Sequence, residues 1–228
     1  MTLDQLRLNK FLALHLGVSR READNIIDQQ RVTINGNKAT LGARFQNGDK
    51  IAIDNKIVGG TVEYKYIALN KPTGYVCSRK QQGTTPTIYE LLPKQFHNLN
   101  TVGRLDHNSS GLIILTNDGD FAYRMTHPSF EKIKIYNVRL DKDLAPLHQQ
   151  MICDYGIKLI DGSSKLQLER MNETERKSWI VTMHEGRNRQ IRRTFDALGY
   201  NVKKLHRTNF GKYSIRDIKS GKFEIIKK

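Results

Sequence analysis

The chain has 228 residues, of which 38% are hydrophobic and 27% charged, and this composition excludes a disordered tail, a collagen and a coiled coil. The 38 Lys and Arg residues against 23 Asp and Glu leave a net charge of +15, which favours a polyanionic partner, either nucleic acid or an acidic membrane surface. The densest apolar run, at residues 112–115, is far too short to span a bilayer, so an integral membrane protein is excluded.

Two helices are predicted at the start of the chain. Apolar residues recur at helical spacing over residues 6–16, and Gly17 ends that helix. Ser19 and Glu22 have the capping-box spacing, in which each side chain satisfies an otherwise unpaired amide at a helix start. A second helix is therefore expected to follow Ser19 and to run to about residue 29.

A hairpin follows these helices. Residues 32–34 alternate as a strand, Asn35-Gly36 is typical of a tight hairpin turn, and residues 50–53 form another short strand. Residues 59–63 contain two glycines at their start and are predicted to be a flexible linker. The predicted domains are thus 1–58, a compact helix-helix-hairpin unit, and 64–228.

Many strands and few helices are predicted in the larger domain. This mixture indicates an α+β fold dominated by an antiparallel sheet. The predicted strands are 64–69, 112–115, 132–140, 165–170 and 179–183, with a short helix at 88–92.

The small domain carries a pattern of basic residues that points to RNA. Arg20 and Arg21 lie at a predicted helix start, where free amides and the helix dipole already favour phosphate. The strings Ser19-Arg20-Arg21-Glu22-Ala23 and Arg31-Val32-Thr33-Ile34-Asn35-Gly36 resemble the small RNA-binding domain first named from the fourth protein of the small ribosomal subunit. The resemblance implies that five residues face structured RNA: Arg7, Lys10, Arg20, Arg21 and Arg31.

Asp106 lies in a polar loop that leads into the predicted strand at 112–115. Such loops commonly present reactive groups, because a rigid scaffold positions them. An Asx turn or a salt bridge to Arg104 would explain the same residue without any catalysis. On the residues alone, both interpretations of Asp106 stay open.

Tyr136 occupies the apolar face of the strand predicted at 132–140. Alternation places it with Val138 and Leu140, away from Asn137 and Arg139. It is therefore either a core tyrosine or a ring that stacks against a base at the edge of a pocket.

The basic charge is concentrated towards the end of the chain. The last 44 residues, from Glu185 on, contain 13 basic and four acidic residues, whereas residues 1–58 contain nine and six. Helical spacing after Gly186 places Arg189, Arg192 and Arg193 on one face. This cluster favours a surface that contacts a phosphate backbone, rather than charge for solubility alone.

Three strings, taken together, identify a known family. They are Gly103-Arg104-Leu105-Asp106, Glu185-Gly186-Arg187-Asn188-Arg189-Gln190-Ile191-Arg192-Arg193 and Lys71-Pro72-Thr73-Gly74. They resemble the RsuA-like branch of ribosomal RNA pseudouridine synthases, and the resemblance covers nearly the whole chain. It implies that Asp106 is the catalytic aspartate, Tyr136 the pocket tyrosine and Arg192 the partner of Asp106, although Arg189 and Arg193 are close neighbours. The residues expected to bind RNA in this domain are Lys71, Arg104, Arg187, Arg189 and Arg193.

The reaction implied by the resemblance is an isomerisation, which detaches uracil from its ribose, turns it and reattaches it through carbon. It requires no metal or cofactor, and the chain shows no metal-ligand cluster and no phosphate-binding or dinucleotide-binding glycine loop. A carboxylate beside an arginine stays ionised, which suits Asp106 as a nucleophile towards either the sugar or the base. The expected partner is ribosomal RNA or a pre-ribosomal particle, with large-subunit RNA preferred over small-subunit RNA as the target.

Location and competing functions complete the expectations. Cys77 and Cys153 have neither the spacing of metal ligands nor that of a disulfide framework, which fits a reducing compartment. Arg7 and Lys10 interrupt any secretory signal, so a cytoplasmic protein is expected. We also expect a monomer without membrane association. A non-catalytic RNA-binding or ribosome-assembly protein would explain the small domain but not Asp106, Tyr136 and the arginines together. The sequence contains no recognition-helix motif of a DNA-binding class, and it lacks the zinc-binding signature of a base deaminase.

Overall fold

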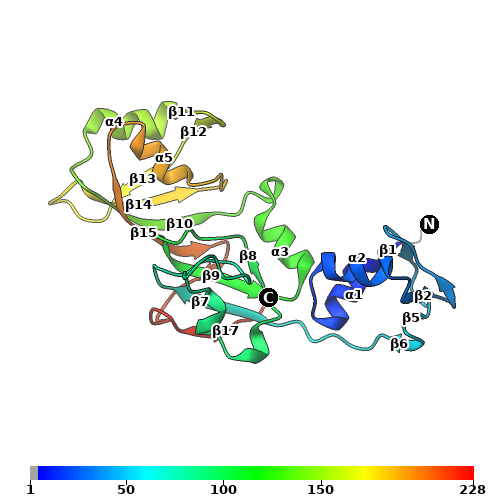
Figure 1. The fold of residues 1–228 in the computed structure, drawn as a ribbon. Helices are drawn as coiled ribbons and strands as arrows, with labels where there is room; N and C mark the ends of the chain where they lie inside the picture. The colour runs from blue at the N-terminus through cyan, green and yellow to red at the C-terminus, as the bar shows by residue number, and fades with distance from the viewer. Residues whose placement is uncertain (1–4) are drawn as a thin grey trace. The chain divides into compact units, whose positions relative to one another are not determined.

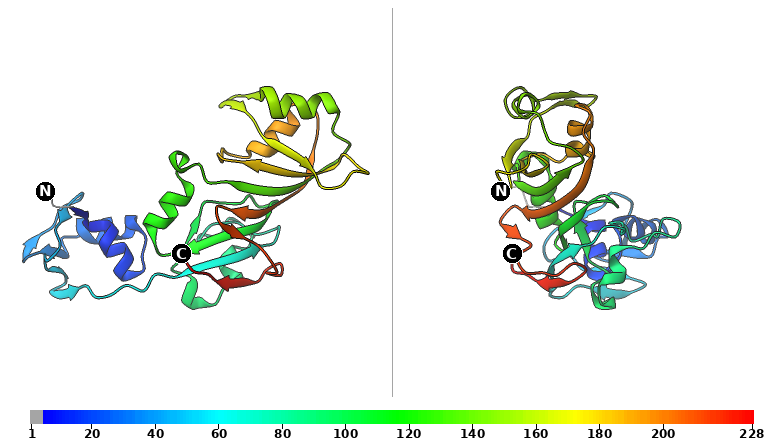
Figure 2. Two further views of the ribbon diagram at one scale, coloured as in Figure 1. Left: turned by 180° about the vertical axis from the view of Figure 1, so that it is seen from behind. Right: turned by 90° about the vertical axis from the view of Figure 1, so that its left-hand side faces the viewer.

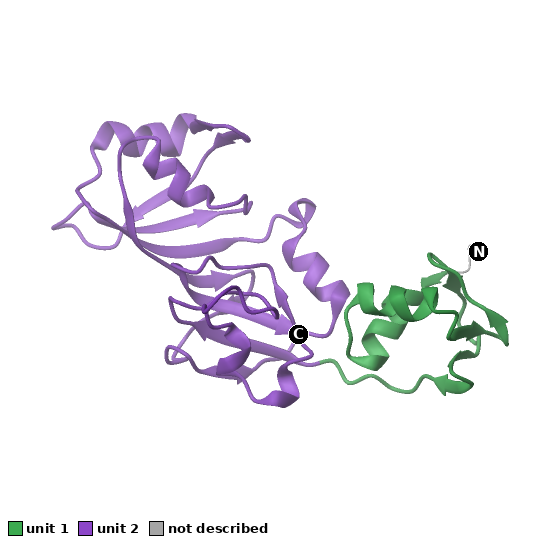
Figure 3. Cartoon of the chain, viewed as in Figure 1, with its two compact units in different colours: residues 1–64 green, residues 65–228 purple. Residues whose placement is uncertain are grey.

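The structure, a computed structural model, describes residues 5–228 and divides into two compact units (Figures 1 and 3). The first unit ends at Tyr64 and the second begins at Lys65. Residues 59–65 have no regular secondary structure, and each unit has a hydrophobic core of its own. Residues 1–4 of the predicted small domain lie outside the described part of the chain.

Helices α1 (Leu8–Leu16) and α2 (Arg20–Asp28) pack together in the first unit. The predicted capping box opens α2, because the Ser19 hydroxyl accepts a hydrogen bond from the Glu22 amide at 3.1 Å while the Glu22 carboxylate accepts one from the Ser19 amide at 2.7 Å. The first helix begins two residues later than predicted. The preceding residues, β1 (Leu6–Arg7), instead pair with β4 (Arg44–Phe45).

A four-stranded antiparallel sheet in the order β3-β2-β5-β6 completes the first unit. Its strands are β2 (Val32–Ile34), β3 (Asn37–Lys38), β5 (Ile51–Ile53) and β6 (Lys56–Val58). Leu8 and Leu12 of α1, Ile27 of α2 and Val32 of the sheet are fully buried against one another. The unit is therefore held by a small apolar core between its helices and its sheet.

The second unit is built on a nine-stranded sheet in the order β13-β14-β10-β15-β9-β7-β17, with β8 beside β9 and β16 beside β15. Only β9 and β15 pair in parallel among these strands, which confirms the predicted mixed, mainly antiparallel sheet. The strands are β7 (Tyr66–Lys71), β8 (Asn100–Val102), β9 (Ser110–Thr116), β10 (Lys134–Leu140), β13 (Gln167–Arg170), β14 (Ser178–Met183), β15 (Val202–Phe210), β16 (Tyr213–Ser214) and β17 (Phe223–Ile225).

Helices and one extra hairpin flank this sheet. They are α3 (Gly119–Thr126), α4 (Pro146–Gln150), α5 (Gln190–Asp196), the 3-10 helices η1 (Ile88–Leu91), η2 (Lys94–Phe96) and η3 (Pro128–Phe130), the π-helical turn η4 (Met151–Tyr155), and the hairpin of β11 (Ile157–Leu159) and β12 (Gly162–Ser164). Both views in Figure 2 show α4, α5 and this hairpin together at one end of the sheet. No helix between residues 5 and 228 is long and apolar enough to cross a bilayer.

Alternation along β7 and β9 gives this sheet two buried faces. Ile67 and Leu69 belong to one hydrophobic cluster, and Tyr66 and Ala68 belong to the other. Phe121 of α3 packs in the second cluster. Because both faces of these strands are covered, the loops at their ends are carried on a rigid base.

Several elements of this unit were not predicted, and helix α3 and strand β15 show why. Helix α3 follows a segment that reads as a turn, and the Asp118 side chain caps it by accepting hydrogen bonds from the amides of Asp120 at 3.0 Å and Phe121 at 2.9 Å. Strand β15 breaks the alternation of apolar residues, because the buried position two residues after Leu205 is Arg207. A register shift against β10 disturbs the pattern further.

Candidate active site

A cleft of about 630 Å³ in the second unit, here called the central cleft, is lined by five of the predicted site residues: Arg104, Asp106, Tyr136, Arg187 and Arg189. Asp106 reaches it from the loop before β9, Tyr136 from β10, and Arg189 from the residue before α5. Arg104 lines the cleft as well and is exposed. Segments far apart in the sequence therefore meet at one site, as the catalytic interpretation of Asp106 requires.

Lys71, at the end of β7, holds the Asp106 loop from beneath. Its side chain is 0% exposed, and its ammonium group donates hydrogen bonds to the carbonyls of Pro72 at 3.0 Å, Asp106 at 3.1 Å and Ser109 at 2.7 Å. The prediction that Lys71 binds RNA is therefore wrong, because three backbone carbonyls use all three of its donors.

Three further contacts hold the same loop. The Gly74 amide donates to the His107 carbonyl at 2.9 Å, and Arg192 donates through Nη2 to the Asn108 carbonyl at 2.8 Å. The Leu105 amide donates to the sulfur of Cys77 at 3.5 Å. Together with Lys71, these contacts bind every carbonyl from Asp106 to Ser109, so the backbone that carries Asp106 is preorganised.

Burial changes the protonation of two groups in this support. It lowers the pKa of Lys71 from 10.5 to about 8, against a smaller opposing effect of the neighbouring Cys77 and Asp106. Burial likewise raises the pKa of the Cys77 thiol. Cys77 is therefore a neutral packing group rather than a nucleophile.

The Asp106 carboxylate is itself only lightly engaged. Its side chain is 35% exposed, and its nearest cationic partner is Nη1 of Arg189, 3.5 Å from Oδ2. Arg189 has φ = +48°, in the left-handed region, and caps α5 instead of lying within it. Its side chain is thus directed by the loop rather than by the helical face that the sequence suggested.

Arg192 does not make the predicted ion pair with Asp106. Its Nη1 donates to the Val202 carbonyl at 2.7 Å, in addition to the bond of its Nη2 to Asn108. Burial, reinforced by the charge of Arg189, lowers the pKa of Arg192, while the charge of Asp106 opposes this effect. The charge of Asp106 therefore acts on Arg192 electrostatically, but the side chain of Arg192 binds the backbone of the Asp106 loop.

Tyr136 is both a core residue and a residue of the cleft, as the alternation along its strand suggested. It is 8% exposed and packs in the same cluster as Val138 and Leu140, yet it lines the central cleft. An aromatic ring that is fixed by packing and reaches a cleft is suited to stack on a base.

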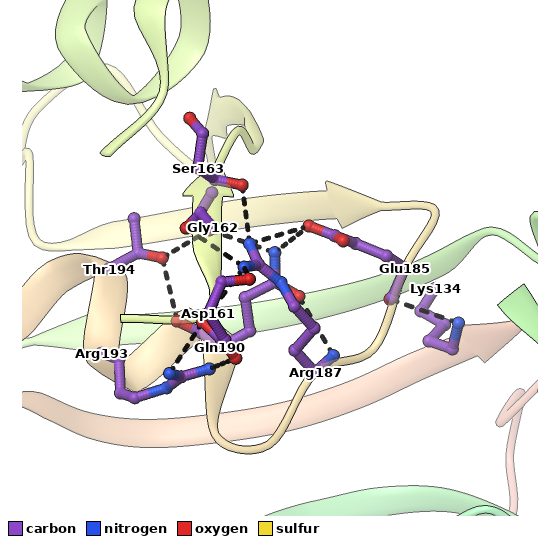
Figure 4. A network of polar contacts seen from close by, with 10 residues as sticks. Lys134, Asp161, Gly162, Ser163, Glu185, Arg187, Gln190, Arg193 and Thr194 are labelled. Carbon is purple, nitrogen blue, oxygen red and sulfur yellow. Dashed lines mark hydrogen bonds and ion pairs between the residues drawn. The ribbon is translucent and has the colours of Figure 1, made fainter. Parts of the chain in front are cut away.

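Two arginines predicted to bind RNA are occupied by carboxylates and carbonyls of the protein (Figure 4). Arg187 donates to Asp161, to the carbonyls of Gly162 and Ser163, and to Glu185. Arg193 makes a two-pronged pair with Asp161 at 3.0 and 2.7 Å. Arg187 and Arg193 therefore fasten the β11–β12 hairpin to α5 and to the loop before it, and RNA binding by these two arginines stays a prediction.

In the first unit, Arg7, Arg20, Arg21 and Arg31 are exposed and Lys10 is partly exposed. Arg20 donates to the side chain of Asn9 at 3.1 Å. Arg31 is 2.6 Å from Asp54, whose hydrogen bond and charge raise the pKa of Arg31. The charge of Arg31 is thus already balanced, unlike an arginine reserved for phosphate.

The central cleft also contains residues that were not predicted as site residues. Lys134 and Phe210 line it, and so does the buried Arg207 of β15. The count of basic residues near the end of the chain was a signal for Arg207, but it did not indicate which of these cations faces a cleft. Phe210 carries no motif that would distinguish it from an ordinary core residue.

The chain belongs to the RNA pseudouridylate synthase family, which it matches over residues 65–197, and it matches the S4 domain over residues 6–51. It is therefore an RNA pseudouridine synthase, an isomerase, with an S4-type RNA-binding domain. This membership settles the choice between an enzyme and a purely structural RNA-binding protein in favour of the enzyme.

Its relatives carry the names of two closely related activities. The chain is 34% identical to the "Ribosomal large subunit pseudouridine synthase B" of Bacillus subtilis (strain 168), over 94% of this chain and 89% of that protein. It is also 34% identical to the "Ribosomal small subunit pseudouridine synthase A" of Pasteurella multocida (strain Pm70), over 93% and 91%. A solved structure described as a pseudouridylate synthase is similar over 97% of this chain and 96% of that one, with a TM-score of 0.69 and 32% identity.

Proposed function

We propose that this enzyme converts a uridine of ribosomal RNA to pseudouridine in the central cleft, with Asp106 as the nucleophile. The observation that carries the proposal is the contrast between the two carboxylates that line the cleft. Glu185 is bound by Arg187 and Gln190, whereas Asp106 has a single long contact to Arg189 on a fully anchored loop. Only Asp106 is both free to react and held in place.

The reaction needs no group from outside the chain. The bond between nitrogen 1 of uracil and carbon 1′ of the ribose breaks, the base turns, and a new bond forms from carbon 5 of uracil to carbon 1′. Carbon 5 loses its proton and nitrogen 1 takes one up, so the product is an isomer of the substrate. Asp106 forms and then releases a covalent bond to either the sugar or the base. Arg189 balances the charge of the free carboxylate, before the covalent bond forms and again once it is released.

Tyr136 and Arg104 are assigned to the RNA. The target uridine must leave its stack, which costs a few kcal/mol, before it can enter the cleft. The Tyr136 ring offers the base a stacking surface, and the exposed Arg104 can occupy the vacated position or hold a flanking phosphate.

The proposed partner is ribosomal RNA or a pre-ribosomal particle, met by a monomer in the cytoplasm. The S4-type domain and the names of the relatives support RNA of the ribosome as the substrate. We expect a large-subunit uridine as the target before a small-subunit one, on the strings at 102–106 and 185–193. Pseudouridine mapping of ribosomal RNA from cells with and without this protein decides the target, and it requires a chemical probe because product and substrate have equal mass.

The test of the mechanism is Asp106→Asn. The amide keeps the size of the carboxylate but cannot attack, so we expect kcat to fall by about a thousandfold or more while affinity for the RNA stays nearly unchanged. The matched control is Asp217→Asn, at an exposed position, which should keep full activity. Full activity in Asp106→Asn would refute the assignment.

A further inference from the structure

Arg207 is an arginine buried inside the central cleft. It is 3% exposed, lies on β15 and lines the cleft. Its position is fixed by the parallel pairing of Arg207 with Gly111 on β9. A Cβ at Gly111 would approach the Arg207 carbonyl oxygen to 2.2 Å, so only glycine allows the two strands this close.

The guanidinium of Arg207 is poorly satisfied. Its Nε donates to the Leu112 carbonyl at 2.8 Å, while its Nη2 is buried without a hydrogen-bond partner among the described residues. No ion pair found between residues 5 and 228 includes Arg207. A buried Nε without a partner also occurs in Arg187, Arg192 and Arg193. Arg187 and Arg193 nevertheless pair with carboxylates, and Arg192 donates through both Nη atoms, whereas the Arg207 side chain has one hydrogen bond and no ion pair among the described residues.

A second cation lies close to it. The Phe210 ring has the Arg207 guanidinium 4.8 Å from its centroid and the Lys134 ammonium 5.4 Å from it. Burial, and after it the positive charge of Arg207, lowers the pKa of Lys134, against the opposing charge of Glu185. The cleft therefore holds two cations around one aromatic ring. Lys134 already donates to the carbonyls of Lys132 at 3.1 Å, Glu185 at 3.3 Å and His184 at 3.5 Å, so it contributes charge rather than free donors. Of the two carboxylates that line the cleft, Glu185 is paired with Arg187 and Asp106 with Arg189.

We propose that Arg207, with Lys134 beside it, forms a subsite for a phosphodiester that flanks the target uridine. A phosphodiester offers the charge and the acceptor oxygens that a guanidinium binds through two nitrogens. A uracil carbonyl would satisfy a donor but would leave the charge of the buried Arg207 and the half-buried Lys134 unbalanced. The inference rests on the proposed function, because it requires an RNA strand in the cleft.

The subsite predicts a link between one arginine and one phosphate charge. RNA fragments containing the mapped uridine are prepared with a neutral methylphosphonate at either flanking linkage. We expect one of these to lower the wild-type kcat/KM by about tenfold to a hundredfold, the cost of one charged hydrogen-bond pair. Arg207→Gln should lose a similar factor on natural RNA and lose no more on the modified RNA.

Controls separate binding from folding. Arg216→Gln, at an exposed position, should keep the full sensitivity to the methylphosphonate, and Arg207→Lys should recover part of it because the charge is retained. Thermal unfolding verifies that each variant folds. If Arg207→Gln does not fold, Lys134→Gln replaces it, and we expect this variant to be less sensitive to the methylphosphonate than the wild type. The subsite would be overturned if the losses in kcat/KM caused by Arg207→Gln and by the methylphosphonate multiplied in combination. It would also be overturned if neither methylphosphonate lowered kcat/KM of the wild type.

A binding measurement keeps this test independent of the proposed function. If no RNA fragment is modified, the full chain is titrated by NMR with uridine 5′-monophosphate and with uridine. The wild type should bind the phosphorylated form more tightly, and Arg207→Gln should show no such preference, whatever the natural target is. Equal binding of both compounds by the wild type would reject the phosphate subsite alone.

Discussion

Lys71 shows what a motif conveys and what it does not. The string Lys71-Pro72-Thr73-Gly74 is recognisable in the sequence, but a lysine is ordinarily exposed, so a surface role in RNA binding was the natural interpretation. Its burial depends on β7 ending beneath the Asp106 loop, a long-range contact that local pattern does not encode.

Lys71 also predicts a dependence on pH. Because its pKa is about 8 in the folded chain, against 10.5 for an ordinary lysine, it loses a proton and one donor as pH rises through about 8. We expect kcat to fall over that range because a loop carbonyl is released. Between about pH 8 and 10.5 the unfolded chain holds more protons than the folded one, so this lysine makes the free energy of unfolding rise with pH.

Opposite trends in activity and stability therefore distinguish titration of Lys71 from alkaline unfolding. The measurement is a kcat profile across neutral and alkaline pH, with thermal unfolding at each point. Lys71→Met should lower kcat by about tenfold, since the loop loses its donors, and should lack the alkaline fall near pH 8. An unchanged alkaline fall in Lys71→Met would assign that proton to another group.

The arginines near α5 show the limit of helical spacing. Arg189, Arg192 and Arg193 share a face on an ideal helix, but Arg189 lies before the helix with φ = +48°. The three side chains consequently go to three places: Asp106, backbone carbonyls and Asp161. The sequence identified the segment correctly, and only the backbone conformation decides which arginine meets the aspartate.

At the scale of elements, regular amphipathic patterns were predictable and interrupted ones were not. The α2 capping box and the alternation of β10 were read from the sequence and are present. Strand β15 was missed, because a buried arginine stands where an apolar residue would keep the period and because its register shifts against β10. The residue that interrupts the apolar alternation of β15 is Arg207, for which we propose a role in phosphate binding.

The β11–β12 hairpin depends on one carboxylate. Asp161 receives hydrogen bonds from both Arg187 and Arg193, and Arg187 also binds Glu185 in the segment that leads to Arg189 (Figure 4). The hydrogen bond from Arg193, more than any other contact, lowers the pKa of Asp161. Hydrogen bonds therefore link this hairpin to the segment that carries Arg189, the arginine beside Asp106.

We expect Asp161→Asn to loosen this coupling. The amide cannot balance two guanidinium groups, so the unfolding temperature should fall, amide exchange over residues 157–164 should accelerate, and kcat/KM should drop severalfold. Asp196→Asn, at an exposed position on α5, is the control and should change none of the three. Faster exchange throughout the unit, without preference for the hairpin, would contradict a local role of Asp161.

At the scale of the whole molecule, the structure changes how the net charge of +15 is understood. Part of the basic charge counted in the last 44 residues is engaged internally, because Arg187 and Arg193 pair with carboxylates and Arg192 binds carbonyls. The charge count predicted a polyanionic partner, and the family supports nucleic acid, but fewer of these cations are free of protein partners than the count suggested. In the first unit, Arg20 and Arg21 remain exposed at the start of α2.

Docking and chemistry should therefore be separable by mutation. Arg20→Gln with Arg21→Gln removes two exposed charges from a helix start, so affinity for RNA should fall, and the slope of its logarithm against that of salt concentration should flatten by about 0.7 to 0.9 for each phosphate that the protein no longer neutralises. The kcat at saturating RNA should be unchanged, because Asp106 lies in the other unit. Arg31→Gln is the control with a smaller effect, since Asp54 already balances that charge. A fall in kcat with unchanged affinity would place these arginines in the chemical step, since a docking residue changes only the amount of RNA bound.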